Sequence, residues 1–205
     1  MVKSSPSGRP GRRAGDSGTR DAILAASRAR FIAAGFRGAT IRAIAAEAGV
    51  DPALVLHFFG SKERLFSESV HLPVDPAKRL HEALECDRET AGAALVEFLL
   101  DTWDSEDANR TMLAIVRSAA TDEPAARMIR EQVVGAVAQT LRAHGMDRAD
   151  YRAALVASQM AGLAIGRYMI GLPPLVEADR AALVEAFGPT VQRYLTGALE
   201  RKERA

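Results

Sequence analysis

Apolar residues recur at intervals of three and four positions along most of the chain, which is the period of an amphipathic helix. The first segment with this pattern runs from about residue 16 or 19 to Ala34, and Gly35 ends it. No segment alternates apolar and polar residues as a half-buried strand does, and no internal repeat is evident. The pattern therefore predicts an all-α protein.

Turn signals separate short helical patterns most closely between residues 40 and 65. Thr40 offers a side-chain oxygen just before IRAIAAEA, which predicts an N-cap and a second helix over about 41–48. Gly49 ends that helix, because the residue after a helix usually needs a positive φ, which glycine adopts without a Cβ penalty.

A third helix is expected directly after this turn. Asp51 is a favoured N-cap and Pro52 is tolerated at the first helical position, so the pair predicts a helix over about 52–58. Gly60 ends it, and Ser61 caps a fourth helix. Two helices joined by a tight glycine turn form the helix-turn-helix plan, whose second helix can enter the major groove of DNA. A generic pair of packed helices has the same spacing.

The pattern stays helical beyond Pro73. Further helices are expected over about residues 76–86, 88–102, 105–120, 122–143, 147–170 and 177–200, which gives nine or ten in total. The last should be interrupted at Gly188-Pro189, since proline kinks or breaks a helix interior. We expect a disordered basic arm over 1–17, a helix-turn-helix domain over 18–71 and a larger helical domain over 72–205.

The charge is distributed unevenly along the 205 residues. Residues 1–62 hold ten Lys and Arg against four Asp and Glu, whereas the remainder holds 17 against 22. A basic N-terminal part suits a surface that faces phosphates, although many two-domain proteins segregate charge to this extent. The hydrophobic content of 48% is that of a soluble globular protein with a core.

Several other classes of protein are disfavoured. The single Cys86 cannot form a disulfide within the chain, and no apolar run approaches the ~18 residues of a membrane span, so we expect a cytoplasmic protein without a membrane partner. No Ser or Cys nucleophile set is suggested, and we expect no enzyme and no cofactor. His71 and His81 could hold a metal with Glu82 or Glu85, but the spacing is loose, and no metal site is predicted.

The N-terminal arm contains GRPGRR, with Arg9 and Arg12. This string resembles the arms of the AT-hook kind, in which arginine side chains enter the narrow minor groove of A·T-rich DNA. A solvated basic tail is the alternative interpretation.

The segment from about Thr19 to Val70 resembles the N-terminal domain of TetR-family transcriptional regulators. The resemblance rests on the apolar first helix ending AAGF, the threonine that opens the second helix, the IAAEAGV turn and the string HFFGSKERLF. One residue departs from the pattern, because Leu56 stands where the family usually has a tyrosine that contacts a phosphate. The rest of the chain is similar to the family only in helicity and length.

The resemblance implies which residues meet DNA. Its third helix reads base edges while the flanking elements grip phosphates. Pro52 and Ala53, at the start of that helix, can offer apolar contact to thymine methyl groups but no bidentate reading, so discrimination should depend on Arg42, the arm and DNA deformability. The predicted DNA-contacting residues are Thr40, Arg42, Asp51, Pro52, Ala53, His57 and Lys62, with Arg9 and Arg12 of the arm.

The resemblance also implies a homodimer built on the last two helices. A stripe of small residues four apart in the long helix suits the close approach of two helices: Ala154, Ser158, Gly162 and Gly166. Close packing within one chain would use the same stripe.

An effector pocket is implied in the domain over 72–205. The candidate lining residues are Phe98, Trp103, Met112, Val116, Met128, Gln159, Leu163 and Tyr168. Each is also compatible with ordinary core, and Gln159 is the least typical of it, since a buried amide needs a partner.

These features predict a transcriptional regulator, a repressor that binds a palindromic double-stranded DNA operator as a dimer and releases it when an unknown small molecule binds. The alternative is a helical small-molecule carrier or enzyme with a vestigial DNA-binding head.

Overall fold

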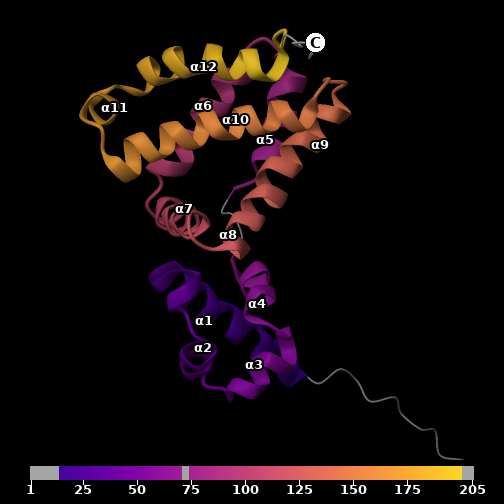
Figure 1. Cartoon of the computed structure of the whole chain (residues 1–205), viewed down its shortest axis with the longest axis vertical. Coiled ribbons are helices and arrows are strands. Elements are labelled where there is room, and N and C mark those ends of the chain that lie inside the picture. Colours follow the sequence, from indigo (N-terminus) through magenta and orange to yellow (C-terminus); the bar gives the residue numbers. More distant parts are fainter. Residues whose placement is uncertain (1–13, 71–73, 200–205) are drawn as a thin grey trace, which may run out of the picture. The chain divides into compact units, whose positions relative to one another are not determined.

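The computed structural model describes residues 14–70 and 74–199, and every regular element in these ranges is a helix. The all-α fold is therefore confirmed. The chain divides into two compact units, Met1–His71 and Leu72–Ala205 (Figure 1). The described residues form eleven separate helices, one more than the upper prediction, because a short helix, α11 (Pro173–Glu177), forms on the proline pair.

The N-terminal unit contains four described helices, which are α1 (Ala14–Gly38), α2 (Ile41–Ala48), α3 (Pro52–Phe59) and α4 (Lys62–Ser69). Helix α1 has a break at Gly35, where φ is 68°, as the sequence predicts. It begins inside the segment 1–17 that was expected to be an arm. Arg9 and Arg12 lie outside the described residues.

The caps predicted from the sequence are present. Thr40 Oγ1 accepts a hydrogen bond from the Ala43 amide at 3.1 Å, and Asp51 Oδ1 accepts one from the Ala53 amide at 2.7 Å. Gly49 has a φ of 67°, so the turn between α2 and α3 uses the left-handed conformation that favours glycine. The ends of α2 and α3 are thus fixed by local chemistry.

An aromatic cluster joins α4 to α1. The ring of Phe66 in α4 meets those of Phe31 and Phe36 nearly edge-on, with centroids 4.9 and 5.4 Å apart. Ile44 of α2 and Val55 of α3 are fully buried against this core. Burial of one face of each short helix leaves the opposite faces of α2 and α3 in solvent.

The C-terminal unit contains the remaining helices. They are α5 (Pro76–Cys86), α6 (Ala91–Asp104), α7 (Glu106–Ala119), α8 (Glu123–Met128), α9 (Ala136–Ala143), α10 (Ala149–Ala164), α11 and α12 (Arg180–Thr196). Two π-helical segments continue the helices that precede them: η1 (Ile129–Gly135) joins α8 to α9, and η2 (Ile165–Ile170) extends α10. Figure 1 shows α10 in orange and α12 in yellow running side by side.

Helices α6 and α12 approach each other closely at two glycines. The Gly92 amide donates a hydrogen bond to Gln192 Oε1 at 2.7 Å. A Cβ at Gly188 would lie only 3.3 Å from Ala93 Cα. Helix α12 continues through Pro189, so the predicted interruption is wrong. Because Glu185 and Pro189 are both exposed, the carbonyl that loses its donor to proline can be hydrated.

Arg152 joins α10 to the C-terminal end of α12. Its side chain is 5% exposed and bonds to Asp147 Oδ1 at 2.6 Å. The same guanidinium donates to the carbonyl oxygens of Tyr194, Leu195 and Gly197 at 3.0 to 3.3 Å. These are carbonyls that a helix end leaves without intrahelical donors, so one buried cation caps α12 from a neighbouring helix.

The sequence was expected to contain no apolar segment as long as a membrane span, but α10 with η2 is such a segment by length and composition. Ala149–Ile170 is a helix of 22 residues whose most apolar window has a mean hydropathy of 1.3, which is enough by length and composition to cross a membrane. Core helices of soluble proteins pass the same test. Arg152 and Arg167 lie within this helix, and both donate to carbonyls of their own unit. Only 28% of the window is buried, so much of its apolar surface is uncovered in a single chain.

Candidate nucleic-acid interface and cavity

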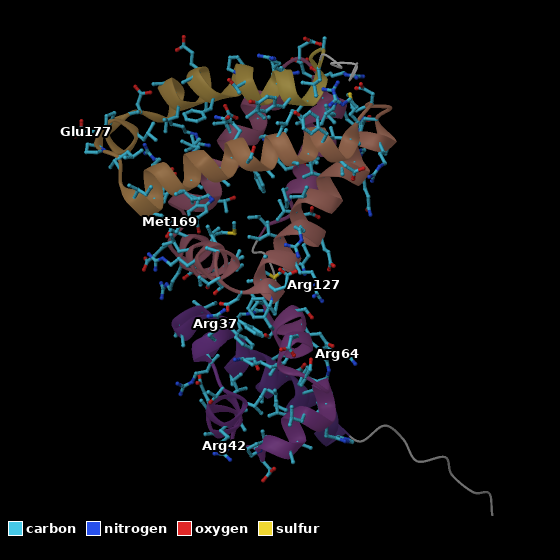
Figure 2. All side chains as sticks on the ribbon, in the orientation of Figure 1. Arg37, Arg42, Arg64, Arg127, Met169 and Glu177 are labelled. Carbon is cyan, nitrogen blue, oxygen red and sulfur yellow. The ribbon has the colours of Figure 1, made fainter. Side chains whose placement is uncertain are left out.

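Most of the described residues predicted to meet DNA lie at the starts of α2, α3 and α4, whereas His57 lies in the last turn of α3. Thr40, Arg42 and His57 are exposed. Figure 2 places Arg42 at the end of the N-terminal unit where α2 and α3 lie. Ala53 is exposed and Pro52 is half-buried, and neither presents a polar head group. Asp51 is exposed, but its carboxylate is engaged as the cap of α3.

Lys62 begins α4 and is half-buried. Its Nζ lies 4.6 Å from the centroid of the Phe36 ring and donates to the Arg37 carbonyl oxygen at 3.5 Å. These contacts hold the ammonium group beside the first turn of α4, where helix amides and the macrodipole favour an anion. The start of α4 is therefore a second cationic helix start, in addition to that of α2, which carries Arg42.

An apolar cavity of about 170 Å³ lies within the C-terminal unit. Four of the eight predicted residues line it: Phe98, Trp103, Met112 and Val116. The rest of the wall comes from Val74, Pro76, Leu95, Leu99, Thr102, Ile115, Ile129, Val133, Val137, Ala153, Val156, Ala157, Met160, Ala161, Ala164 and Ile165. No charged side chain of the described residues belongs to this wall.

The other four predicted residues do not line this cavity. Met128 and Leu163 are buried in the core, with side chains 3% and 1% exposed. Gln159 is half-exposed. It lies off the face of α10 that lines the cavity, which carries positions 153, 156, 157, 160, 161 and 164. Tyr168 stacks on the cavity residue Trp103, with ring centroids 5.3 Å apart.

Tyr168 is held as a neutral hydrogen-bond donor. Its hydroxyl donates to Asp104 Oδ1 at 2.8 Å. Burial, followed by this hydrogen bond and the charge of Asp104, raises the pKa of Tyr168 to about 12, although Arg167 opposes the shift. The phenol therefore stays protonated throughout the physiological pH range and fixes the ring against Trp103.

Sequence reasoning missed the contribution of the π-helical segments. Ile129 and Val133 of η1 and Ile165 of η2 all line the cavity. A π segment widens a helix locally and is frequent at functional sites. Nothing in the apolar spacing distinguishes these residues from those of an ordinary α-helix, so the sequence offers no signal for them.

Comparison with known proteins decides the family. Residues 23–68 match the family described as bacterial regulatory proteins, tetR family, and residues 89–195 match the tetracyclin repressor-like C-terminal domain. A solved TetR-family regulator from Streptomyces coelicolor A3 is 35% identical, with a TM-score of 0.67 over 91% of this chain and 99% of that chain. The chain belongs to the TetR family.

Other solved structures share the TetR-family fold. A transcriptional regulator from Rhodococcus sp. Rha1 is 27% identical, with a TM-score of 0.57 over 88% of this chain and 99% of that chain. The structure of the SmeT–triclosan complex is 21% identical, with a TM-score of 0.57 over 84% and 90% of the two chains, and shows likeness of fold alone. No curated protein sequence matches the chain. The family-model match over residues 23–68 and the 35% identical regulator confirm the resemblance drawn from residues 19–70, and the chain is a transcriptional regulator with an N-terminal DNA-binding domain.

Leu56, which departs from the usual TetR-family pattern, is exposed to solvent on α3. Leu56 lies in α3 with a side chain that is 45% exposed. An apolar side chain in solvent on the helix that the family presents to DNA can make van der Waals contact but cannot donate to a phosphate.

The small-residue stripe is divided between two environments in this TetR-family chain. Ala154, Ser158 and Gly162 are exposed, and a Cβ at Gly162 would meet nothing within 4 Å. Gly166 is buried, and a Cβ there would lie 3.0 Å from a methyl group of Leu175. Gly166 therefore serves packing within the chain rather than the predicted surface, while the other three form one open face of small residues.

Proposed function

We propose that this TetR-family regulator is a repressor that binds a palindromic operator as a homodimer and releases it when a small molecule occupies the cavity. The observation that carries the proposal is the set of capped starts of α2, α3 and α4, which carry the exposed Thr40 and Arg42 and the half-buried Lys62 on a rigid core. This function requires the cytoplasm as compartment. TetR-family regulators act by binding, and we propose no reaction for the chain.

The helix starts supply the phosphate contacts. Because Thr40 Oγ1 already accepts from the Ala43 amide, its hydroxyl hydrogen is available to donate to a phosphate. Lys62 adds a full positive charge at the start of α4. Asp51 acts as the cap of α3 rather than as a DNA contact, since its carboxylate would repel the backbone. Pro52 and Ala53 give α3 an apolar tip that suits thymine methyl groups.

Replacing Lys62 with alanine should weaken operator binding about tenfold and make it less sensitive to salt. Each phosphate contact contributes about 0.9 to the slope of log K against log salt, so a dimer that loses two contacts should lose about 2 in slope. Fluorescence anisotropy at several salt concentrations measures both quantities. Arg117→Ala is the matched control, because Arg117 is an exposed arginine of α7 in the C-terminal unit.

The same titrations distinguish two roles for Arg42. In Arg42→Ala, a uniform loss of affinity over substituted operators indicates a phosphate contact, whereas lost discrimination at one base pair indicates base reading. An unchanged salt slope in Lys62→Ala would contradict the proposed interface. Ligand binding without any DNA affinity would indicate the rival function, a small-molecule carrier with a vestigial head.

The cavity indicates an uncharged, apolar effector. Its described lining residues carry no charge, and the Thr102 hydroxyl already donates to the Phe98 carbonyl oxygen at 2.8 Å. Burial of an ion among such groups would be costly. A volume of about 170 Å³ is similar to that of an apolar cavity of ~150 Å³ known to bind benzene. The structure of SmeT with triclosan supports the view that this fold accepts a small molecule.

Naphthalene and indole should therefore raise the melting temperature of the protein and lower its operator affinity, whereas benzoate should do neither. The ligand can shift the DNA-bound state only by binding the two states with different affinity. Thermal melting and operator titration measure the two effects. Ala157→Phe fills part of the cavity and should abolish both responses. A benzoate response equal to that of naphthalene would contradict the assigned effector class.

A second copy of the chain suits the open face of α10. Ala154, Ser158 and Gly162 lie on a helix that is mostly uncovered, and Tyr151 and Ile170 on the same helix are 49% and 66% exposed. Small residues let two helices approach closely, and a two-fold pair places two DNA-binding domains on a palindrome. This support is independent of the cavity.

A further inference from the structure

A second cluster of polar residues lies in the C-terminal unit, outside the cavity wall. His81 Nδ1 lies 3.0 Å from His144 Nε2, and His144 Nδ1 lies 3.6 Å from Glu85 Oε1. One ligand atom from each of the three residues lies within 4.8 Å of the others. We propose that these residues bind a divalent transition metal ion, of which zinc suits the donor set best, and that the ion links α5 to the end of α9.

The donor types and their spacing fit such an ion. Imidazole nitrogens and a carboxylate oxygen are common zinc ligands, with metal–nitrogen distances of about 2.0–2.1 Å. His144 can bind the ion through only one ring nitrogen, and Nε2 is the one that faces His81 Nδ1, while Nδ1 faces Glu85. Two nitrogens on a tetrahedral ion are about 3.3 Å apart, so the His81 Nδ1–His144 Nε2 pair needs to open by only ~0.3 Å, and Glu85 must turn away from His144 Nδ1 to reach the ion. His81 and Glu85 are four positions apart on α5 and share one face. The Glu85 side chain is 64% exposed and can turn toward the ion without unpacking anything.

The backbone that carries the ligands is fixed by the core. Leu80 and Leu84 of α5 pack in the same buried cluster as Ala138 and Leu141 of α9. His144 follows the last turn of α9, where the Met146 amide donates to the Leu141 carbonyl oxygen at 2.9 Å and closes the helix end. The two histidines are thus held close together before any ion arrives, which lowers the cost of ordering them.

Neighbouring acidic residues do not compete for the same place. Glu82 forms ion pairs with Lys78 and Arg79 at 3.9 and 3.7 Å, on a different side of α5. The sequence suggested His71 as the partner of His81, but His71 lies outside the described residues. The structure instead brings His144 beside His81 across 63 positions of sequence, through the packing of α5 on α9.

The linked helices also form part of the cavity. Pro76 of α5 and Val137 of α9 both line it. An ion held by three protein ligands and a water molecule would fasten two walls of the cavity to each other, and would stabilise the folded C-terminal unit by mass action.

The test is a zinc titration of the full-length, tag-free chain by calorimetry, with cobalt(II) absorption as a second readout. One ion per chain is expected, together with visible cobalt bands of a site with fewer than six ligands. Glu85→Gln should weaken zinc binding about tenfold or more, and His81→Gln and His144→Gln should weaken it further. Glu82→Gln is the matched control and should bind zinc as the parent does.

Both glutamates are exposed, so this pair tests the site without threatening the fold. The proposal is overturned if the parent binds no zinc, if Glu85→Gln and Glu82→Gln bind it equally, or if His144→Gln retains full affinity. It is also overturned if Cys86→Ser removes the binding while the histidine variants keep it, because the adjacent thiol would then be the ligand.

Discussion

Replacing Gly92 with alanine is expected to destabilise the C-terminal unit by about 3 kcal/mol or more. A Cβ at this position would lie 2.5 Å from Gly188 O and from Gln192 N, which are both backbone atoms of α12. Backbone atoms cannot rotate away as a side chain can, so α6 and α12 would have to separate and loosen the core between them. Overpacking of this kind typically costs about 1–3 kcal/mol and occasionally more.

Urea unfolding followed by circular dichroism measures this loss, which should also lower the melting temperature by about 6–12 °C. Gly18→Ala is the control, because Gly18 is an exposed residue of α1 where a Cβ meets nothing within 4 Å and alanine favours a helix. We expect its stability to be unchanged or slightly raised. Equal stability of the Gly92→Ala and Gly18→Ala proteins would show that the close approach of α6 and α12 is not a constraint.

The second large effect is expected for Gly162→Trp, which should give a folded monomer whose operator affinity is lower by about a hundredfold or more. Gly162 is exposed and a Cβ there meets nothing within 4 Å, so we expect a single chain to tolerate the larger side chain. Two-fold symmetry would place two such side chains in the proposed helix-to-helix contact and prevent close approach. Without the dimer, each DNA-binding domain engages a half-site alone and loses the gain from linkage, which is typically about 10²–10⁴.

Analytical ultracentrifugation and operator titration test this expectation together. Ala120→Trp, at the exposed end of α7, introduces the same side chain elsewhere in the C-terminal unit and should remain dimeric with full affinity. A Gly162→Trp protein that still dimerises and binds the operator normally would contradict the proposed interface. A monomeric parent protein would contradict it more directly.

Local chemistry explains why the N-terminal unit could be predicted closely. Thr40 and Asp51 accept hydrogen bonds from amides two or three positions ahead, so their capping role can be predicted from the neighbouring sequence alone. Gly49 takes the left-handed conformation that its place after α2 requires. The family likeness added what spacing alone does not provide, which is the expectation that these helices meet DNA.

Features that depend on packing between distant segments could not be predicted from the sequence. His144 approaches His81 only because α5 packs on α9. The cavity wall gains Ile129 and Val133 because α8 continues as a π-helical segment, which regular apolar spacing does not reveal. Pro189 was expected to break α12, but exposure of its turn allows hydration of the freed carbonyl.

The carbonyl cap provided by Arg152 has a mechanical consequence. If α10 slid past the end of α12, the buried Arg152 guanidinium would lose its hydrogen bonds to the carbonyl oxygens of Tyr194, Leu195 and Gly197 together. The close approach at Gly92 restrains α6 against α12 in the same way. Helices α6, α10 and α12 therefore form a rigid group. We expect any shape change driven by a molecule in the cavity to be taken up by α7, η1 and α9, which neither restraint holds.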